Sequence, residues 1–242
     1  MISFRDILYR LEKAGAGLLF PYCRCLCCGA PVAGELLCPA CGEKRRALRS
    51  CPSCASFISS TETEHYLCRS CRMDPPVFTA AAAALPYEGE FRSLLLSFKY
   101  HGETGLRRPL AELMATLCRE RFSAVAFDGI VPVPAHKERL AERGYDQAVL
   151  LGRLLAKEIG VPCREDILRR QKKTPPLAGL NRREREKVMK DAFLAADCRG
   201  MTLLLADDIF TTGATADAAA RELMKKGAAA VYVLTAAAGR DL

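Results

Sequence analysis

The sequence has 242 residues, of which 50% are hydrophobic and 26% are charged, with a formal net charge of +8. These values are typical of an ordinary soluble globular protein. The sequence has no apolar run of about 18 residues, and its first residues lack the basic-then-apolar pattern of a signal peptide, so we expect no membrane insertion and no export.

Composition divides the chain into three parts. Residues 1–20 carry an apolar stripe at helical spacing and predict an amphipathic N-terminal helix. Residues 21–75 are rich in Cys, Gly and Pro, as expected where a metal replaces a hydrophobic core. Pro75 and Pro76 predict a boundary, because neither residue continues a helix or a central strand. Residues 76–242 form the larger predicted domain.

Four C-x-x-C pairs lie in the cysteine-rich part, at the spacing of structural zinc sites. Without an export signal, these cysteines predict metal binding in a reducing, cytoplasmic compartment and not a disulfide framework. We predict two structural Zn²⁺ sites, one formed by Cys25, Cys28, Cys38 and Cys41, the other by Cys51, Cys54, Cys68 and Cys71. A cross-braced pairing stays open at this point, as does replacement of Cys25 or Cys28 by Cys23 or Cys27.

Predicted strands alternate with predicted helices in the larger domain. The strands are expected at residues 78–85, 129–133, 202–206 and 230–235, with short strands at 167–168 and 192–194. The helices are expected at residues 91–99, 106–121, 146–159 and 214–226. This alternation predicts an α/β fold with a mostly parallel sheet flanked by helices.

Residues 203–215, LLLADDIFTTGAT, are the most informative segment. Their apolar run predicts a buried strand, with Asp207 and Asp208 at its carboxyl end, where open α/β sheets bind ligands. The loop from Thr211 to Thr215 then opens a helix whose first N–H groups suit a phosphate. Carboxylates for sugar hydroxyls or Mg²⁺, beside a phosphate-binding loop, fit a ribose 5-phosphate. The alternative is a strand–turn–helix junction with two surface acids.

This segment resembles the PRPP-binding signature of type I phosphoribosyltransferases at all thirteen positions. The resemblance implies a PRPP site with Mg²⁺, in which the two acids hold the ribose hydroxyls and the loop holds the 5-phosphate. The residues concerned are Asp207, Asp208, Thr211, Thr212, Gly213, Ala214 and Thr215.

A second candidate anion site lies in residues 131–147, VPVPAHKERLAERGYDQ. A predicted strand ends there, and a predicted loop with Arg139, Arg143 and Gly144 leads into a helix for which Asp146 is a candidate N-cap. Strand end, cations and helix N-terminus together predict a site for an anion. The alternative is a pair of solvated arginines on a connecting loop.

Residues 169–191 concentrate the positive charge, with nine Lys or Arg and three acids. The length of this segment, without a strong period, predicts a functional loop. Because the charge is local, a uniformly basic nucleic-acid binder is not indicated. A solvated charge run and contact with nucleic acid both stay open as alternatives.

Together, the Pro-Val-Pro segment, the R-x-x-x-R-G-Y-x-Q pattern, the PRPP signature and the preceding Cys-rich ribbons resemble the ComF family. Its members are competence-associated, phosphoribosyltransferase-like proteins. The resemblance covers nearly the whole chain and implies a type I phosphoribosyltransferase fold with a small N-terminal zinc-ribbon domain. It also implies that the diphosphate of PRPP is bound by Arg139, Arg143, Gly144 and Gln147, within reach of Lys99. Thr174 and Arg185 then lie in a basic loop that closes over PRPP and neutralises the diphosphate.

These features predict transfer of ribose 5-phosphate from PRPP to a nitrogen acceptor, with Asp207, Asp208, Arg139 and Arg143 as catalytic residues. The alternative is a non-catalytic protein that binds PRPP or a nucleotide. It would contact single-stranded DNA or the DNA-uptake machinery in natural competence. No segment predicts a dedicated nucleobase site, so the acceptor discriminates between the two hypotheses.

Overall fold

The computed structural model describes residues 24–47, 49–58, 67–100, 102–172, 174 and 182–239. The predicted helix at residues 1–20 and Cys23 lie outside the described residues. The chain forms two compact units, Met1–Ala47 and Leu48–Leu242. This division falls between the two predicted zinc sites, so the second site belongs to the larger unit. The boundary expected at residues 75 and 76 stays a prediction.

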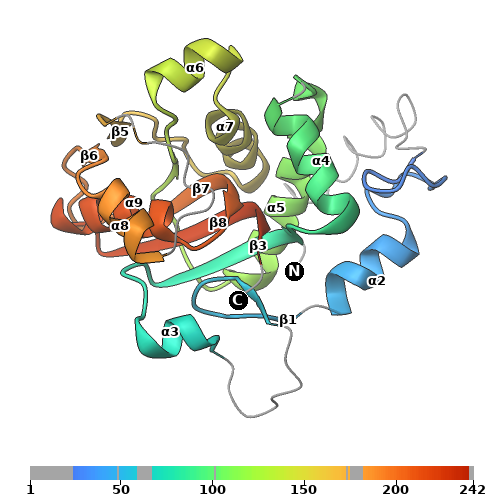
Figure 1. Ribbon diagram of the computed structural model, residues 1–242, viewed down its shortest axis with the longest axis horizontal. Helices are drawn as coiled ribbons and strands as arrows, with labels where there is room; N and C mark the ends of the chain where they lie inside the picture. The colour runs from blue at the N-terminus through green and yellow to red at the C-terminus, as the bar shows by residue number, and fades with distance from the viewer. Residues whose placement is uncertain are drawn as a thin grey trace. The chain divides into compact units, whose positions relative to one another are not determined.

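Among the described residues, four parallel strands form the main sheet of the larger unit, in the order β3-β8-β7-β4 (Figure 1). They are β3 (Ala80–Pro86), β8 (Ala230–Ala238), β7 (Thr202–Phe210) and β4 (Gly129–Pro132). The first half of β7 is a buried apolar run, as expected for a central strand with both faces covered. The parallel sheet confirms the predicted α/β class.

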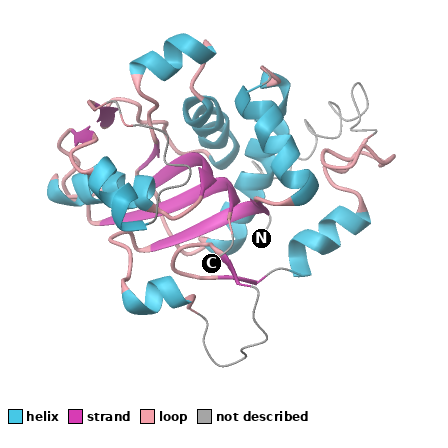
Figure 2. Ribbon diagram, viewed as in Figure 1, coloured by secondary structure: helices cyan, strands magenta, loops and turns pink. Residues whose placement is uncertain are grey.

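Helices cover both faces of this sheet (Figure 2). Helices α5 (Arg107–Arg121) and α7 (Gln147–Ile159) pack against each other and against one face. Helix α9 (Ala214–Lys225) covers the other face, where its buried alanines share a core with Leu203 and Leu205. Among the described helices, none combines the length and apolar character that a membrane-spanning segment requires.

Shorter elements complete the described part of the chain. The smaller unit contains helix α2 (Pro39–Ala47). The larger unit adds helices α3 (Arg69–Met73), α4 (Gly89–Tyr100), η1 (Thr104–Leu106), α6 (Lys137–Arg143) and α8 (Arg182–Met189). It also contains antiparallel pairs of β1 (Arg49–Ser50) with β2 (Phe57–Ile58), and of β5 (Leu168–Arg170) with β6 (Phe193–Ala195).

Strand β7 is longer than predicted. The prediction ended it at residue 206, before the two acids, because Asp is depleted in strands. The backbone instead continues to pair with β8 as far as Phe210, which lies opposite Ala238. Asp207 and Asp208 therefore lie within the last part of the strand, on backbone held by the neighbouring strand.

Two segments predicted as loops contain helices. Helix α6 has the sequence KERLAER, a run of strong helix formers that starts after His136 and ends at Gly144 in the left-handed conformation (φ 76°). Helix α8 lies within the basic segment. The loop predictions are wrong there, because the charged residues that suggested loops are also strong helix formers. Arg139, Arg143 and Arg185 accordingly lie on helices.

Candidate functional site

The acid pair, Asp207 and Asp208, accepts hydrogen bonds from neighbouring backbone N–H groups, and Asp208 also forms an ion pair with one lysine. The backbone N–H of Asp208 donates to Oδ1 of Asp207 at 2.8 Å, and that of Ile209 donates to Oδ1 of Asp208 at 2.7 Å. Nζ of Lys99, in the last turn of α4, lies 2.6 Å from Oδ2 of Asp208. Asp208 is only 7% exposed. The second acid is thus part of a buried ion pair.

The pKa values of the two carboxyl groups are shifted in opposite directions. Burial and the charge of Asp208 raise the pKa of Asp207 well above its usual value, against the opposing effect of Lys99. Burial acts on Asp208 as well, but the Lys99 ammonium outweighs it and lowers the pKa of that carboxyl. Burial also opposes the charge on Lys99, yet Asp208 keeps the pKa of the ammonium above its usual value. Asp208 is therefore the ionised member, and Asp207 is the member that takes up a proton first.

Residues 211–215 connect the acid pair to α9, and they are called the phosphate loop below after the ligand that the sequence predicts for them. Thr211 and Thr212 are exposed, and Ala214 is the first residue of the helix. The N-cap is Gly213, which has no side chain with which to cap the helix. The first N–H groups of a helix lack partners within the helix and carry the positive end of its dipole. This end of α9 therefore has the chemistry of an anion site.

Gly213 is required by both conformation and space. Its φ of 80° lies in the left-handed region, which disfavours other residues. A Cβ at this position would lie 2.6 Å from Cζ of Phe210, the last residue of β7. The ring of Phe210 thus lies directly against the phosphate loop. Its role was not predicted, although the large side chain three residues before a required glycine was visible in the sequence.

The N-terminus of α7 is capped by the protein itself. The carboxylate of Asp146 accepts hydrogen bonds from the backbone N–H groups of Ala135 (2.7 Å), Ala148 (3.0 Å) and Val149 (3.3 Å). The predicted N-cap is therefore confirmed. A carboxylate therefore already occupies the positive end of α7, and the anion site expected at residues 131–147 stays a prediction.

The residues before and at the start of α7 bind the end of α4. Nε2 of Gln147 donates to the carbonyl oxygen of Lys99 at 3.1 Å, and the hydroxyl of Tyr145 donates to that of Phe98 at 2.8 Å. Gln147 is only 3% exposed. These bonds fix the turn of α4 that carries the Lys99 ammonium to Asp208. The sequence predicted Lys99 as a diphosphate ligand and missed this ion pair, which joins residues far apart in the chain.

Residues near the start of the basic segment, 169–191, pack against residues at and just after its end. Thr174 is 3% exposed, and its hydroxyl accepts a hydrogen bond from Nη2 of Arg170. The Arg170 guanidinium lies 5.3 Å from the ring centroid of Phe193, and its Nη2 lies 3.7 Å from Sδ of Met189. Thr174 is thus buried and held by Arg170. The side chains of Arg139, Arg143 and Arg185 are outside what the structure describes.

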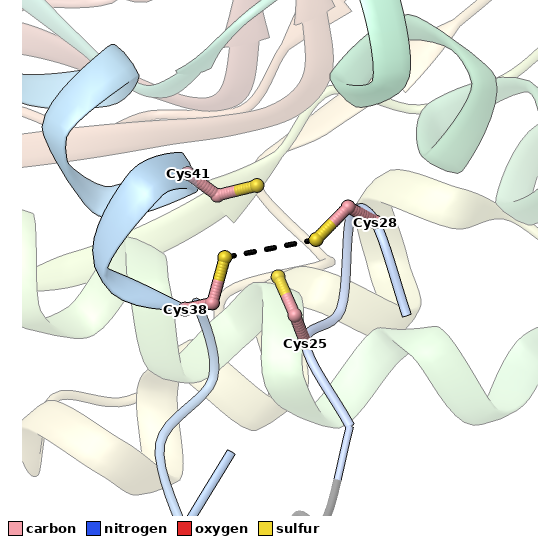
Figure 3. Close-up of side chains that lie close together, drawn as sticks. All are labelled: Cys25, Cys28, Cys38 and Cys41. Atoms are coloured by element: carbon pink, nitrogen blue, oxygen red, sulfur yellow. Dashed lines mark hydrogen bonds between the residues drawn. The ribbon is translucent and has the colours of Figure 1, made fainter. Parts of the chain in front are cut away.

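In the part of the chain that the structure describes, two groups of four cysteines bring their sulfur atoms within 4.8 Å of one another. The first cluster is Cys25, Cys28, Cys38 and Cys41, whose side chains point toward a common centre (Figure 3). The second cluster is Cys51, Cys54, Cys68 and Cys71. The pairs are thus combined in sequence order, and the cross-braced arrangement is not formed. Cys27 lies outside both groups.

Both clusters fit a tetrahedral zinc ion. Sulfur atoms bound to zinc at about 2.3 Å stand about 3.8 Å apart in a tetrahedron. Sγ of Cys28 lies 3.6 Å from that of Cys38, and Sγ of Cys54 lies 3.6 Å from that of Cys68. All four cysteines of the second cluster are buried, whereas Cys28 of the first cluster is exposed. Four thiolates leave no open position, so the clusters have the character of structural sites.

Proteins similar to this chain have names that refer to competence or to DNA. Competence protein F of Haemophilus influenzae is 27% identical over 221 residues, which are 87% of this chain and 94% of that protein. Competence protein ComFC of Bacillus subtilis is 28% identical over 81% of each chain. DNA utilization protein YhgH of Escherichia coli is 28% identical over 86% of this chain and 94% of that protein. No family model matches the chain.

Similar solved structures are phosphoribosyltransferase-related. Glutamine phosphoribosylpyrophosphate amidotransferase from Bacillus subtilis is 19% identical, with a TM-score of 0.40 over 57% of this chain and 30% of that chain. Adenine phosphoribosyltransferase from Saccharomyces cerevisiae is 24% identical, with a TM-score of 0.35 over 54% of this chain and 68% of that chain. The match thus spans less than a third of the amidotransferase chain.

Proposed function

Because the chain belongs to the ComF family, we propose that it binds PRPP with Mg²⁺ and transfers ribose 5-phosphate to a nitrogen acceptor. One observation carries this proposal. The acid pair, Asp207 and Asp208, and the glycine-capped N-terminus of α9 lie on one strand–loop–helix segment. Carboxylates for the ribose hydroxyls, followed at once by N–H groups for a phosphate, match the two ends of a ribose 5-phosphate.

The proposed contacts divide PRPP into three parts. Asp207 and Asp208 bind the ribose hydroxyls, and the phosphate loop binds the 5-phosphate. The diphosphate lies against the cations of α6 and α8, with Lys99 close to the acid pair. Carboxylate oxygens also suit Mg²⁺, which prefers hard oxygen ligands and, when bound, neutralises part of the diphosphate charge.

The proposed reaction is a substitution at C1 of the ribose. The nitrogen lone pair of the acceptor forms a bond to C1, the bond from C1 to the diphosphate oxygen breaks, and its electron pair leaves with the diphosphate. The nitrogen then loses a proton to solvent. Since no protein group is covalently modified, the residues act by orienting PRPP and by neutralising the departing charge.

A second candidate function is PRPP binding without turnover, in a protein that contacts single-stranded DNA during DNA uptake. The names of the relatives favour it, and so does the basic segment at residues 169–191. In this case DNA affinity falls steeply as the salt concentration rises. Binding releases the cations that are condensed on the DNA phosphates, and added salt opposes this release. Measured DNA affinity that does not change between low and physiological salt contradicts this candidate.

Calorimetric titration of PRPP with Mg²⁺ tests the first proposal. The intact protein is expected to bind, and Asp207→Asn/Asp208→Asn is expected to lose most of the affinity. Asp197→Asn is the matched control, because this exposed acid pairs only with Arg199 among the bonds described for it. If the intact protein does not bind PRPP, the proposal is wrong. If it binds, diphosphate release with a panel of nitrogen acceptors separates turnover from binding alone.

A further inference from the structure

The second cysteine cluster and the phosphate loop share one hydrophobic core. Cys51, Cys54, Cys68 and Cys71 belong to the same buried cluster as Phe78, Phe210 and Ala214. Phe210 is the residue before the phosphate loop, and Ala214 lies within it. The second cluster is therefore part of the packing beneath the proposed PRPP site.

A backbone route joins the cluster to the start of the loop. Phe57, in the strand between Cys54 and Cys68, donates its N–H to the carbonyl oxygen of Gly239 at 3.0 Å. Gly239 in turn donates its N–H to the carbonyl oxygen of Phe210 at 2.8 Å. Two successive hydrogen bonds thus connect the segment between the metal ligands to the last residue of β7.

An aromatic contact also connects the cluster to the loop. Phe78, seven residues after Cys71, packs edge-to-face on Phe210 with the ring centroids 6.1 Å apart. The Phe210 ring lies against Gly213, where a Cβ would clash with it. Displacement of Phe78 therefore changes the support of the residue that caps α9.

A third contact fixes α9 itself. The backbone N–H of Val77 donates to Oδ1 of Asp217 at 2.6 Å, and the N–H of Asp217 donates to the carbonyl oxygen of Gly213 at 2.7 Å. Val77 follows α3, the helix that carries Cys71. The chain leaving the metal cluster thus holds the first turn of α9 in place.

From these contacts we infer that the second metal cluster positions the phosphate loop, with Phe210 as the positioning residue between them. This inference rests on the proposed PRPP site. Its consequence is reciprocal coupling: a metal in the second cluster tightens PRPP binding, and PRPP tightens metal binding there by the same factor. The first cluster belongs to the smaller unit, so we expect no such coupling for it.

The test uses two double variants of the full chain. Cys25→Ser/Cys28→Ser retains the second cluster, and Cys51→Ser/Cys54→Ser retains the first, so each is expected to hold one zinc ion by elemental analysis. Zinc affinity is measured against a competing chelator, with and without PRPP and Mg²⁺. PRPP is expected to raise zinc affinity about 5-fold to 150-fold in the first variant. Equal effects of PRPP on zinc affinity in both variants overturn the inference. The cause is then PRPP acting on the zinc or the chelator in solution, and not a contact between the second cluster and the phosphate loop.

Phe210 is tested in the chain that retains the second cluster. Phe210→Leu is expected to keep the zinc ion but to reduce the coupling factor, because the smaller side chain no longer packs against both Phe78 and Gly213. A Phe210→Leu variant that binds PRPP more weakly, but with an unchanged coupling factor, shows a merely structural role for the ring.

Failure of the proposed function is separable from failure of this inference. If the intact protein does not bind PRPP, amide hydrogen exchange at residues 211–216 is compared with and without zinc in the second cluster. Faster exchange without zinc supports the positioning role on its own, and unchanged exchange overturns it. If Cys51→Ser/Cys54→Ser fails to fold, zinc removal from the other double variant by the chelator provides the metal-free state.

Discussion

Helices α7 and α9 both begin beside a predicted anion site, yet their first turns differ in what occupies them. At the start of α7, the carboxylate of Asp146 accepts hydrogen bonds from three backbone N–H groups. Gly213 begins α9 with no side chain, on backbone that only glycine adopts easily. We therefore expect the N-terminus of α9 to bind an anion more readily than that of α7, whose own capping carboxylate already accepts from its first N–H groups.

The largest expected effect comes from Lys99, which links the strand before α9 to the start of α7. Its ammonium pairs with Asp208 in β7, and its carbonyl oxygen accepts a hydrogen bond from Gln147 at the start of α7. Lys99→Met leaves the Asp208 carboxylate buried without its cation, so we expect a loss of about 3–5 kcal/mol of stability at neutral pH. Urea unfolding measures it.

The pH dependence of the Lys99→Met effect has a fixed sign. Lys99 lowers the folded-state pKa of Asp208, so its stabilisation is present above the unfolded-state value of about 3.9 and is lost as pH falls through the folded value. The stability difference between wild type and variant must therefore shrink as the solution is acidified. A difference that grows in acid contradicts the ion pair.

Gly213→Ala is expected to have the next largest effect. The left-handed backbone costs about 1–3 kcal/mol for another residue, and the clash with Phe210 adds to it. PRPP affinity is expected to fall together with stability. Gly160→Ala is the control at the end of α7, because Gly160 has a similar φ of 74° but nothing within 4 Å of a Cβ. Equal effects on PRPP affinity from both substitutions contradict a special role for the phosphate loop.

Asp146→Ala is expected to cost about 1 kcal/mol through loss of the α7 cap. Asp146→Asn is expected to cost less, since its amide oxygen can keep the bonds from Ala148 and Val149, although its NH2 group cannot accept the bond from Ala135. The free energy of unfolding in urea measures both. PRPP affinity is expected to change little in Asp146→Asn. A large loss of PRPP affinity there shows instead that the carboxylate charge belongs to the PRPP site.

The smallest effect concerns inorganic phosphate, which reports on the two helix starts directly. At a concentration equal to its Kd, a ligand stabilises its site by only about 0.4 kcal/mol. Hydrogen exchange is expected to slow at residues 211–216 and to stay unchanged at residues 147–149. Protection at the start of α7 shows that Asp146 does not exclude anions.

Local patterns predicted the parts of the fold that depend on local chemistry. An Asp before an apolar helical run predicted the α7 cap, and alternating strands and helices predicted the α/β class. The predictions failed where two local preferences compete. Asp207 and Asp208 indicate a strand end, but pairing with β8 extends β7 past them. The charged run in α8 indicates a loop, but the same residues are good helix formers.

The residues of the two cysteine clusters were predictable from the sequence, whereas the contacts around Asp208 and Phe210 were not. C-x-x-C spacing identified the eight cysteines, whereas only the sulfur positions settled that neighbouring pairs combine. The Lys99–Asp208 ion pair and the packing of Phe78 on Phe210 join segments separated by more than a hundred residues. Such contacts depend on the strand order of the sheet, which spacing within one segment does not encode.

The strand order also has a consequence for how the chain is made. Strand β3 pairs only with β8 in the described sheet, and β8 is the last of the described strands in sequence order. During synthesis, residues 80–86 leave the ribosome long before residues 230–238 exist to pair with them. The sheet is therefore complete only after residue 238 has been made, and contacts of such large sequence separation slow folding. Until then β3 lacks its partner strand, and an unpaired apolar strand edge favours aggregation.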